Sequence, residues 1–533
     1  MRKPGGMAMT DGWPTLRRRA RPADIILLLE GTYPMVRGGV AGWVDQLIRG
    51  LPDLRFALVF LGGRRHDYQG ILYARPENVV HLECHYLFDD MLRSGAPRQR
   101  RGNRRAFAAS RELHETLRAP EVSPDAALCQ AARLLGRTGG LTQDDFLYSQ
   151  AAWEQILEHY HRDYPDPSFI DYFWSVRNMH TPLFLLSHIA RQLPPGRCLH
   201  AISTGYAGFL GALAHHITRR PLLVSEHGIY TKERQIDLVQ ADWIRDPTDP
   251  LTHGFQTHTG YLRRMWVRFF QSLGRMTYAS ACGITTLYEG NRQRQLLDGA
   301  AEERTRVIPN GIGIERFRPL RDTTGSTGRQ VVTLLGRVTP IKDIKTFIRA
   351  MHQLLSRVPQ AEGWIVGPES EDPDYARECH DLVQQLGLET RVRFLGFQRT
   401  ETILAQSRLV VLTSISEAQP LVALEAMAAG VPVVCSDVGA CRELVLGSGR
   451  SERPSGRIAP IASPGATAAA MAELLEDDQA WQQAREAGIA RVEAEYTEAL
   501  MLSRYRQLYV DAGALPGDRK ETSKDGGDRI RTA

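Results

Sequence analysis

Short apolar runs recur along this chain, and helical patterns separate almost every run from the next. Most of the runs are continuously apolar instead of alternating with polar residues, which is typical of parallel strands covered by helices on both faces. The early runs are 24–30, 56–61, 79–82, 222–225, 283–287 and 306–309, and the late runs are 331–335, 363–366, 392–395, 409–413 and 432–436. We therefore predict an α/β fold class with two doubly wound, Rossmann-like domains.

The domain boundaries follow from length and composition. A chain of 533 residues is too long for one hydrophobic core. Pro319 and the Gly-, Ser- and Thr-rich stretch after it mark the joint, so we predict one domain over 23–318 and a second over 319–496. Residues 1–22 and 515–533 are polar and rich in charge, and we predict disordered tails there.

One part of the first domain departs from the alternation of strands and helices. From about 90 to 200 the chain is rich in Arg and in helical periodicity, and we predict a helical insertion there. The insertion could be a structural elaboration or a docking surface for another protein, and the sequence leaves both interpretations open.

Three bulk properties narrow the function classes. The net charge of +5 is small for this length and argues only weakly for nucleic acid, so we expect no nucleic-acid partner. The seven cysteines form no C-x-x-C pair, so we expect neither a structural metal nor a disulfide framework, and a reducing cytoplasm fits. No apolar run approaches the roughly 18 residues of a membrane span. The run that ends at Glu30 is better explained as a buried strand than as a signal peptide.

The late half carries two carboxylates eight residues apart, in the segment 416–426. Glu417 lies in a short polar loop after an apolar strand, and Glu425 lies about two turns along the helix that follows. The start of that helix offers backbone N–H groups to an anion, and Glu425 could accept hydrogen bonds from a diol. A phosphate between two diol-binding groups describes a nucleotide sugar. The alternative is an ordinary amphipathic helix with two solvated carboxylates.

Two cations bracket another loop between a strand and a helix. Arg337 and Lys342 follow the strand at 331–335, and Asp343 can cap the next helix. Ligands bind at this end of parallel sheets. Two fixed cations there would stabilise the negative charge on a departing nucleoside diphosphate. The alternative is a pair of surface cations near a helix start.

The early half offers weaker signals. Gly38 and Gly39 lie between the first strand and a helix, where they would let the backbone approach a ligand. They form no G-x-G-x-x-G, so dinucleotide binding is disfavoured. His227 follows the strand at 222–225, at the end where a cleft would lie. Taken alone, the glycines are explained by a turn and the histidine by a structural role.

The two late motifs resemble those of family 4 retaining glycosyltransferases, in which E-x7-E and G-R-x4-K mark the donor site. The resemblance covers most of 24–512. It implies a GT-B fold, in which the two domains face a cleft and the last helix, over 497–514, crosses back to the first domain. It also implies two sets of site residues. The catalytic set is His227, Arg337, Lys342 and Glu417, and the donor-binding set is Gly38, Gly39, Arg337, Lys342, Val392, Ala418, Gln419, Pro420, Leu421 and Glu425.

The roles of these residues also come from the resemblance. Arg337 and Lys342 would hold the diphosphate, while Glu417 and His227 would position the hexose. Glu425 would bind the ribose, and the backbone around Val392 would border the base. With the charge offset by these groups, no metal or other cofactor is expected.

A narrower resemblance rests on the first domain. The opening segment 25–43, the segment 226–230 and the helical insertion look like those of the cytoplasmic glycosyltransferases that take part in the synthesis of Pel. Pel is an exopolysaccharide of biofilms. This implies transfer of a hexosyl unit from a UDP-sugar to a growing glycan acceptor, in the cytoplasm. It also implies docking to an inner-membrane polysaccharide synthase. The alternative is a non-catalytic subunit of such a synthase that binds a nucleotide sugar or serves only for docking.

Overall fold

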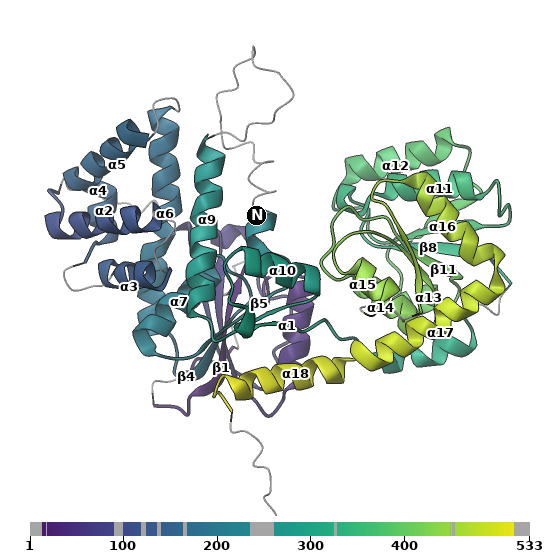
Figure 1. Ribbon diagram of the computed structural model, residues 1–533, viewed down its shortest axis with the longest axis horizontal. Helices are drawn as coiled ribbons and strands as arrows, with labels where there is room; N and C mark the ends of the chain where they lie inside the picture. The colour runs from purple at the N-terminus through teal and green to yellow at the C-terminus, as the bar shows by residue number, and fades with distance from the viewer. Residues whose placement is uncertain are drawn as a thin grey trace, which may run out of the picture.

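The computed structural model describes residues 13–16, 19–89, 100–118, 124–135, 140–163, 168–234, 261–324, 328–447, 449 and 453–515. Two domains lie side by side, each built on one sheet whose neighbouring strands are all parallel (Figure 1). This confirms the predicted fold class.

The first sheet is seven-stranded, in the order β3-β2-β1-β4-β5-β6-β7, and the second is six-stranded, in the order β10-β9-β8-β11-β12-β13. The strands of the first sheet are β1 (Ala23–Glu30), β2 (Phe56–Gly62), β3 (Val79–Tyr86), β4 (Gly196–Ala201), β5 (Leu222–Glu226), β6 (Gly283–Thr286) and β7 (Thr305–Val307). Those of the second are β8 (Val331–Leu335), β9 (Glu362–Val366), β10 (Val392–Phe394), β11 (Leu409–Leu412), β12 (Val433–Ser436) and β13 (Gly456–Ala459).

Helices cover both faces of each sheet. In the first domain they are α1 (Gly39–Gly50), α2 (Arg104–Arg118), α3 (Pro124–Leu134), α4 (Gln143–Tyr148), α5 (Gln150–Asp163), α6 (Phe169–Gln192), α7 (Tyr206–Thr218), α9 (Tyr261–Ser280) and α10 (Glu289–Leu297). The later helices are α11 (Ile344–Leu354), α12 (Pro373–Gln385), α13 (Thr400–Leu404), α14 (Leu421–Ala428), α15 (Cys441–Leu446), α16 (Pro464–Glu476), α17 (Asp478–Glu495) and α18 (Glu498–Asp511). Among the described residues, none of the helices has the length and apolar character needed to cross a membrane.

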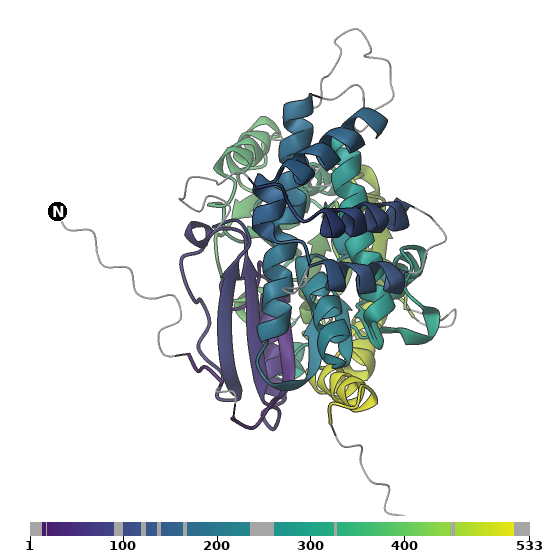
Figure 2. The ribbon, with the colours of Figure 1, turned by 90° about the vertical axis from the view of Figure 1, so that its left-hand side faces the viewer.

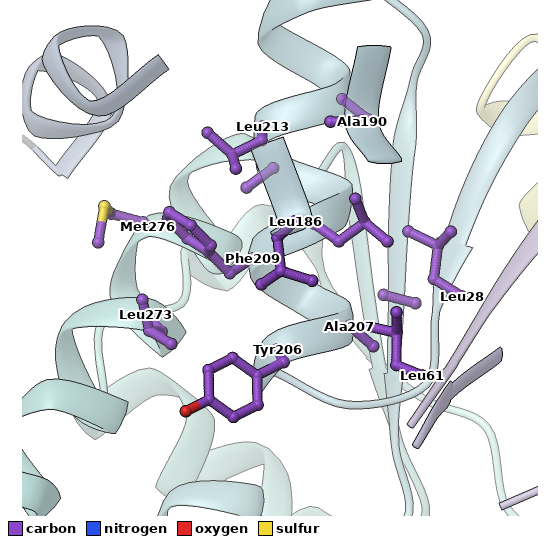
Figure 3. Close-up of a cluster of buried hydrophobic side chains, with 14 of the residues drawn as sticks. Leu28, Leu61, Leu186, Ala190, Tyr206, Ala207, Phe209, Leu213, Leu273 and Met276 are labelled. Carbon is purple, nitrogen blue, oxygen red and sulfur yellow. The ribbon is translucent and has the colours of Figure 1, made fainter. Parts of the chain in front are cut away.

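The strand β1 shows why its sequence is continuously apolar. Ile26 and Leu28 pack on one side of the sheet, in a core that contains Phe209 of α7 (Figure 3). Ile25 and Leu27 pack on the other side, against α1 and α18. Because successive side chains of a strand point to opposite faces, a strand covered on both faces buries both sets of side chains, which favours apolar residues along most of its length.

The helical insertion ends earlier than predicted. Helices α2 to α6 lie beside the first sheet and extend away from it (Figure 2), but 196–201 form β4, which pairs with β1. The prediction that the insertion runs to about 200 is therefore wrong at its end. The strand was missed because it contains Arg197 and His200. His200 is fully buried, and its ring nitrogens meet the hydroxyls of Tyr509 at 3.0 Å and Ser225 at 2.8 Å.

The last helix, α18, lies against the first domain (Figure 1), where Met501, Tyr505 and Tyr509 are buried in the core that α1 also joins. The chain therefore crosses between the domains twice. The two crossings pair with each other: Ile312 N donates to Tyr496 O at 2.9 Å, and Glu498 N donates to Ile312 O at 3.0 Å.

Candidate functional site

The two late motifs form one structural unit at the carboxyl edge of the second sheet. The loop after β8 and the loop after β11 are joined by Thr413, whose hydroxyl donates to the carbonyls of Lys342 at 3.0 Å and Asp343 at 2.9 Å. Ile415 N also donates to Ile341 O at 3.0 Å. The fold thus brings together two segments that the sequence identified separately.

Lys342 and Glu417 form an ion pair within this unit, with the ammonium donating to the carboxylate. Their side chains are only 22% and 14% exposed, so water screens the pair poorly. Asp343 fixes the position of Lys342, because it caps α11 by accepting from Thr346 N at 3.2 Å, as predicted. Its φ of 45° lies in the left-handed region, which Asp tolerates better than most residues.

Arg337 and Glu425 lie on the same two segments but have other partners. Arg337 is 53% exposed, and its guanidinium donates to both carboxylate oxygens of Glu371, at 2.5 and 2.7 Å. Glu425 accepts from Arg316 at 2.6 Å. Burial raises the pKa of Glu425 above its usual value, although Arg316 opposes the shift. The two acids of the E-x7-E segment therefore contact different cations.

Two glycines outside the predicted donor-binding set let backbones meet at this edge. A Cβ at Gly439, where φ is 54°, would come within 2.1 Å of the carbonyl oxygen of Glu417. A Cβ at Gly367 would come within 2.0 Å of the carbonyl oxygen of Gly336. Each follows a predicted strand within a few residues, and a glycine in that position was the available signal.

His227 follows β5 at the carboxyl edge of the first sheet. It is buried, with 7% of its surface exposed, and its ring centroid lies 4.5 Å from that of Trp43 on α1. Its Nε2 is buried and has no hydrogen-bond partner among the residues that the structure describes. Burial lowers the pKa of His227 to about 4, so the imidazole is neutral near pH 7.

Gly38 and Gly39 are exposed at the start of α1. The fold does not require glycine at either position. The φ of Gly38 is 166°, which is extended backbone, and no described atom lies within 4 Å of where a Cβ would stand at either residue. The space beside them is open.

Two acids near His227, one of them buried, hold the first domain's edge together. Glu226 is 1% exposed and accepts from Thr204 at 2.8 Å, from Gln295 at 2.9 Å and from Tyr278. Glu30 ends β1 and accepts from the Tyr230 hydroxyl at 2.8 Å. Both acids are satisfied by protein donors, so they act as structural anchors of this edge. Glu30 was not identified as a site residue from the sequence.

The carboxyl edges of the two sheets meet at a direct contact. Asn310 N, just after β7, donates to Gln419 Oε1 at 2.7 Å. On the same side of the molecule, Glu289 N at the start of α10 lies 3.3 Å from a carboxylate oxygen of Glu443 on α15. The same first turn of α10 carries Asn291, which donates to the carbonyl of His227 at 3.1 Å. Helix α10 therefore contacts both the His227 loop and the second domain.

The remaining predicted residues of 418–421 lie in the same loop as Glu417. Ala418 O accepts from Ala440 N at 2.8 Å, next to the close approach of Gly439. Pro420 is the N-cap residue of α14 and Leu421 is its first residue. The loop is thus held on one side by the turn that follows β12 and on the other by Asn310.

The expectation for Val392 is wrong. Val392 begins β10 and pairs with Gly363 near the start of β9. The site loops follow the carboxyl ends of their strands, whereas Val392 stands at the amino end. Its side chain is 3% exposed and packs in the core of the second domain. The apolar run 392–395 gave the correct strand but did not show which end of it borders the site.

Two family models match separate parts of the chain, one largely over the first sheet and one over the second. The family model described as a domain of unknown function, DUF3492, matches residues 23–303, and the model described as glycosyl transferases group 1 matches residues 329–477. The second match contains Arg337, Lys342, Glu417 and Glu425.

Curated relatives share part of the chain. It is 34% identical over 168 residues to the D-inositol 3-phosphate glycosyltransferase of Nocardia farcinica, covering 29% of this chain and 37% of that protein. It is 32% identical over 231 residues to the phosphatidyl-myo-inositol mannosyltransferase of Mycolicibacterium smegmatis, covering 42% and 55%. The chain spans about half the length of the curated relatives it matches.

Solved structures share the whole architecture. The Anabaena protein HepE in complex with UDP matches with a TM-score of 0.55 at 17% identity, covering 91% of this chain and 99% of that one. Sucrose-phosphate synthase from Thermosynechococcus elongatus matches with a TM-score of 0.55 at 19% identity, covering 92% and 99%. These likenesses concern the fold, and they confirm the GT-B architecture.

Proposed function

The chain belongs to the family defined by the DUF3492 domain, and from that membership together with its glycosyl transferases group 1 domain we propose that it is a retaining glycosyltransferase. The reaction would move a hexosyl unit from a UDP-sugar to a growing exopolysaccharide. Complexes of HepE with UDP and with UDP-glucose support the choice of donor.

The observation that carries the proposal is the ion pair between Lys342 and Glu417. It lies at the carboxyl edge of a parallel sheet, where doubly wound folds bind ligands. A diphosphate arriving here would compete with Glu417 for the ammonium of Lys342. Glu417, once displaced, would be free to accept hydrogen bonds from hexose hydroxyls. The pair would therefore couple diphosphate binding to the positioning of the sugar.

Charge on the leaving group would be stabilised by the two cations of the loop after β8. Lys342 is held by the Asp343 cap, while Arg337 is exposed and has room to turn from Glu371 toward a phosphate. Preorganised cations and N–H groups of this kind act where charge develops in the transition state. With these groups in place, we propose that transfer requires no divalent cation and no other cofactor.

The first domain would contribute His227 and the glycines of α1. A neutral imidazole whose Nε2 has no described protein partner can donate to, or accept from, a hexose hydroxyl. The open space beside Gly38 and Gly39 would admit the donor phosphates or the acceptor to the start of α1. Glu425 would hold the ribose from the second domain.

A panel of UDP-sugars tests the proposal. A ligand that binds only the folded chain raises its apparent stability, so the correct donor should raise the Tm, and release of UDP in the presence of an oligosaccharide acceptor should follow. A chain that no UDP-sugar stabilises, under conditions where it is folded, would contradict the proposal.

A second candidate function is that of a docking subunit, favoured by exposed apolar side chains on the insertion. Trp153, Trp174 and Ile170 are 46%, 53% and 66% exposed. The acceptor glycan and an inner-membrane polysaccharide synthase of the Pel type are the partners we propose for either function. Donor hydrolysis or transfer by the purified protein separates the two, because a subunit that only docks would show neither.

A further inference from the structure

Three side chains able to bind a metal converge where the insertion meets the first domain. Asp125 and Cys129 lie four residues apart on α3, so they share one face of that helix. His216 lies near the end of α7. One ligand atom from each of the three lies within 4.8 Å of the other two. None of the three belongs to the site described above.

The contacts exclude a catalytic relay. His216 Nε2 lies 3.4 Å from the Sγ of Cys129 and 3.4 Å from Oδ1 of Asp125. In a Cys–His–Asp triad the acid and the nucleophile face different ring nitrogens. Here both face the same nitrogen, so the three ligand atoms point toward a common centre.

The spacing is that of a tetrahedral zinc site. Zinc bonds of about 2.0–2.3 Å at tetrahedral angles separate neighbouring ligand atoms by roughly 3.3–3.6 Å. The separations of His216 Nε2 from Cys129 Sγ and from Asp125 Oδ1, 3.4 Å each, agree with that range. A bifurcated Nε2–H bond to the sulfur and the carboxylate would give the same two contacts, and the metal-binding test below separates the two arrangements.

The cluster is exposed on one side, where a metal ion can enter. The side chain of His216 is 9% exposed, whereas that of Asp125 is 58% exposed, so the cluster opens to solvent on the side of the acid. Cys129 is half-buried between them. A water molecule entering from the Asp125 side could complete a four-coordinate site.

We propose that Asp125, Cys129 and His216 bind one zinc ion, which fastens α3 of the insertion to α7 of the first domain. Binding would release the thiol proton of Cys129, since thiolate is the form that binds zinc. Helix α3 also places Ala127 and Leu128 in the main core of this domain, so the metal would reinforce an existing contact between insertion and domain. This inference is independent of the proposed transfer reaction.

Cobalt substitution of the full-length protein tests the site. Co²⁺ should bind with a stoichiometry of one and give an intense sulfur-to-cobalt charge-transfer band, together with the strong visible bands of tetrahedral coordination. Cys129→Ser should abolish the charge-transfer band. Cys282→Ser is the matched control, because Cys282 is an exposed cysteine outside the cluster, and it should leave the spectrum unchanged.

Two further variants keep the test informative if Cys129→Ser folds poorly. Asp125→Asn changes a largely exposed side chain and should weaken zinc binding at least tenfold, measured by competition with a chromophoric chelator. His66→Gln, at an exposed histidine elsewhere, should not weaken it. Zinc should also raise the Tm of the wild-type chain and not that of Asp125→Asn at the same concentration. A cobalt spectrum without the charge-transfer band, or one that Cys129→Ser leaves intact, would overturn the proposal.

Discussion

Lys342 and Glu417 are 75 residues apart in the sequence and form an ion pair between the loops that follow β8 and β11. Neither motif alone would place its charged residue so that the two neutralise each other. The proposed site therefore has its cation and its acid in direct contact, and a bound diphosphate would compete with Glu417 for the ammonium of Lys342.

The leaving-group role of the cations is tested by Lys342→Ala and Arg337→Ala. Each should slow turnover by roughly 10²–10³-fold, the scale for losing one preorganised donor. Lys345→Ala is the control, because Lys345 lies on the adjacent helix and pairs with the exposed Glu378. Steady-state rates of UDP release give the comparison, and wild-type turnover in both site variants would remove the assignment.

The ribose role of Glu425 predicts a change in donor binding. Glu425→Ala should raise the KM for the UDP-sugar and leave kcat nearly unchanged, because a ribose contact acts equally in the ground and transition states. Glu401 also pairs with Arg316, at 3.4 Å, so Glu401→Ala disturbs Arg316 without removing the proposed contact. An equal rise in KM for both variants would point to Arg316 instead.

Glycine at position 39 is predicted to serve the ligand and not the fold. Gly39→Ala should raise the free energy of unfolding by about 0.4–1 kcal/mol, because the unfolded chain loses conformational freedom, while transfer activity falls. Gly42 lies on the same helix with equally open space around a Cβ, so Gly42→Ala should be stabilising and fully active. Denaturant unfolding and rate measurements on the two variants decide the matter, and equal activity would leave Gly39 without a site role.

Acid should destabilise the chain from mildly acidic pH downward. Burial lowers the pKa of His200 to about 3 and that of His227 to about 4, from an ordinary value of 6.5. At pH values between the lowered pKa of the folded chain and the ordinary pKa of 6.5, the unfolded chain binds more protons than the folded chain. The free energy of unfolding therefore falls as the pH falls from about 6.5 to 4. His200→Gln should make the dependence of Tm on pH shallower over this window. His66→Gln, at an exposed histidine, should leave the slope unchanged.

Transfer is predicted to continue in excess chelator. Initial rates should be unchanged by EDTA, and Mn²⁺ should not raise them, because protein cations offset the diphosphate charge. The proposed zinc site could lower stability in chelator, so the assay should be repeated with Asp125→Asn. Loss of activity that Mn²⁺ restores, in both wild type and Asp125→Asn, would refute metal-independent transfer.

The sequence predicted the parts of the fold that depend on local pattern. Continuous apolar strands and the cap at Asp343 follow from short-range rules and occur in the structure. Strand β4 did not follow, because its buried His200 is satisfied by Tyr509, 309 residues away in sequence. No local pattern reports a partner at that distance.

The same limit applies to the sites. Lys342 and Glu417 each lay in a recognisable motif, so both could be identified, but their pairing is a property of the folded chain. The cluster of Asp125, Cys129 and His216 was not predicted from the sequence, because Cys129 and His216 are 87 residues apart and form no metal-binding spacing. The prediction at Val392 failed for a different reason: the strand was right, but its direction relative to the site was not considered.

The bridge between Ile312 and Thr497 has a mechanical consequence. Both peptide crossings pass through one small region, and Gly311 is so close to its neighbour that a Cβ would come within 2.5 Å of the carbonyl oxygen of Thr497. Two domains connected only along one line can rotate about that line as a hinge, but they resist sliding past one another. Any large movement between the halves should therefore be a rotation that keeps the register of the opposed edges each time they come together.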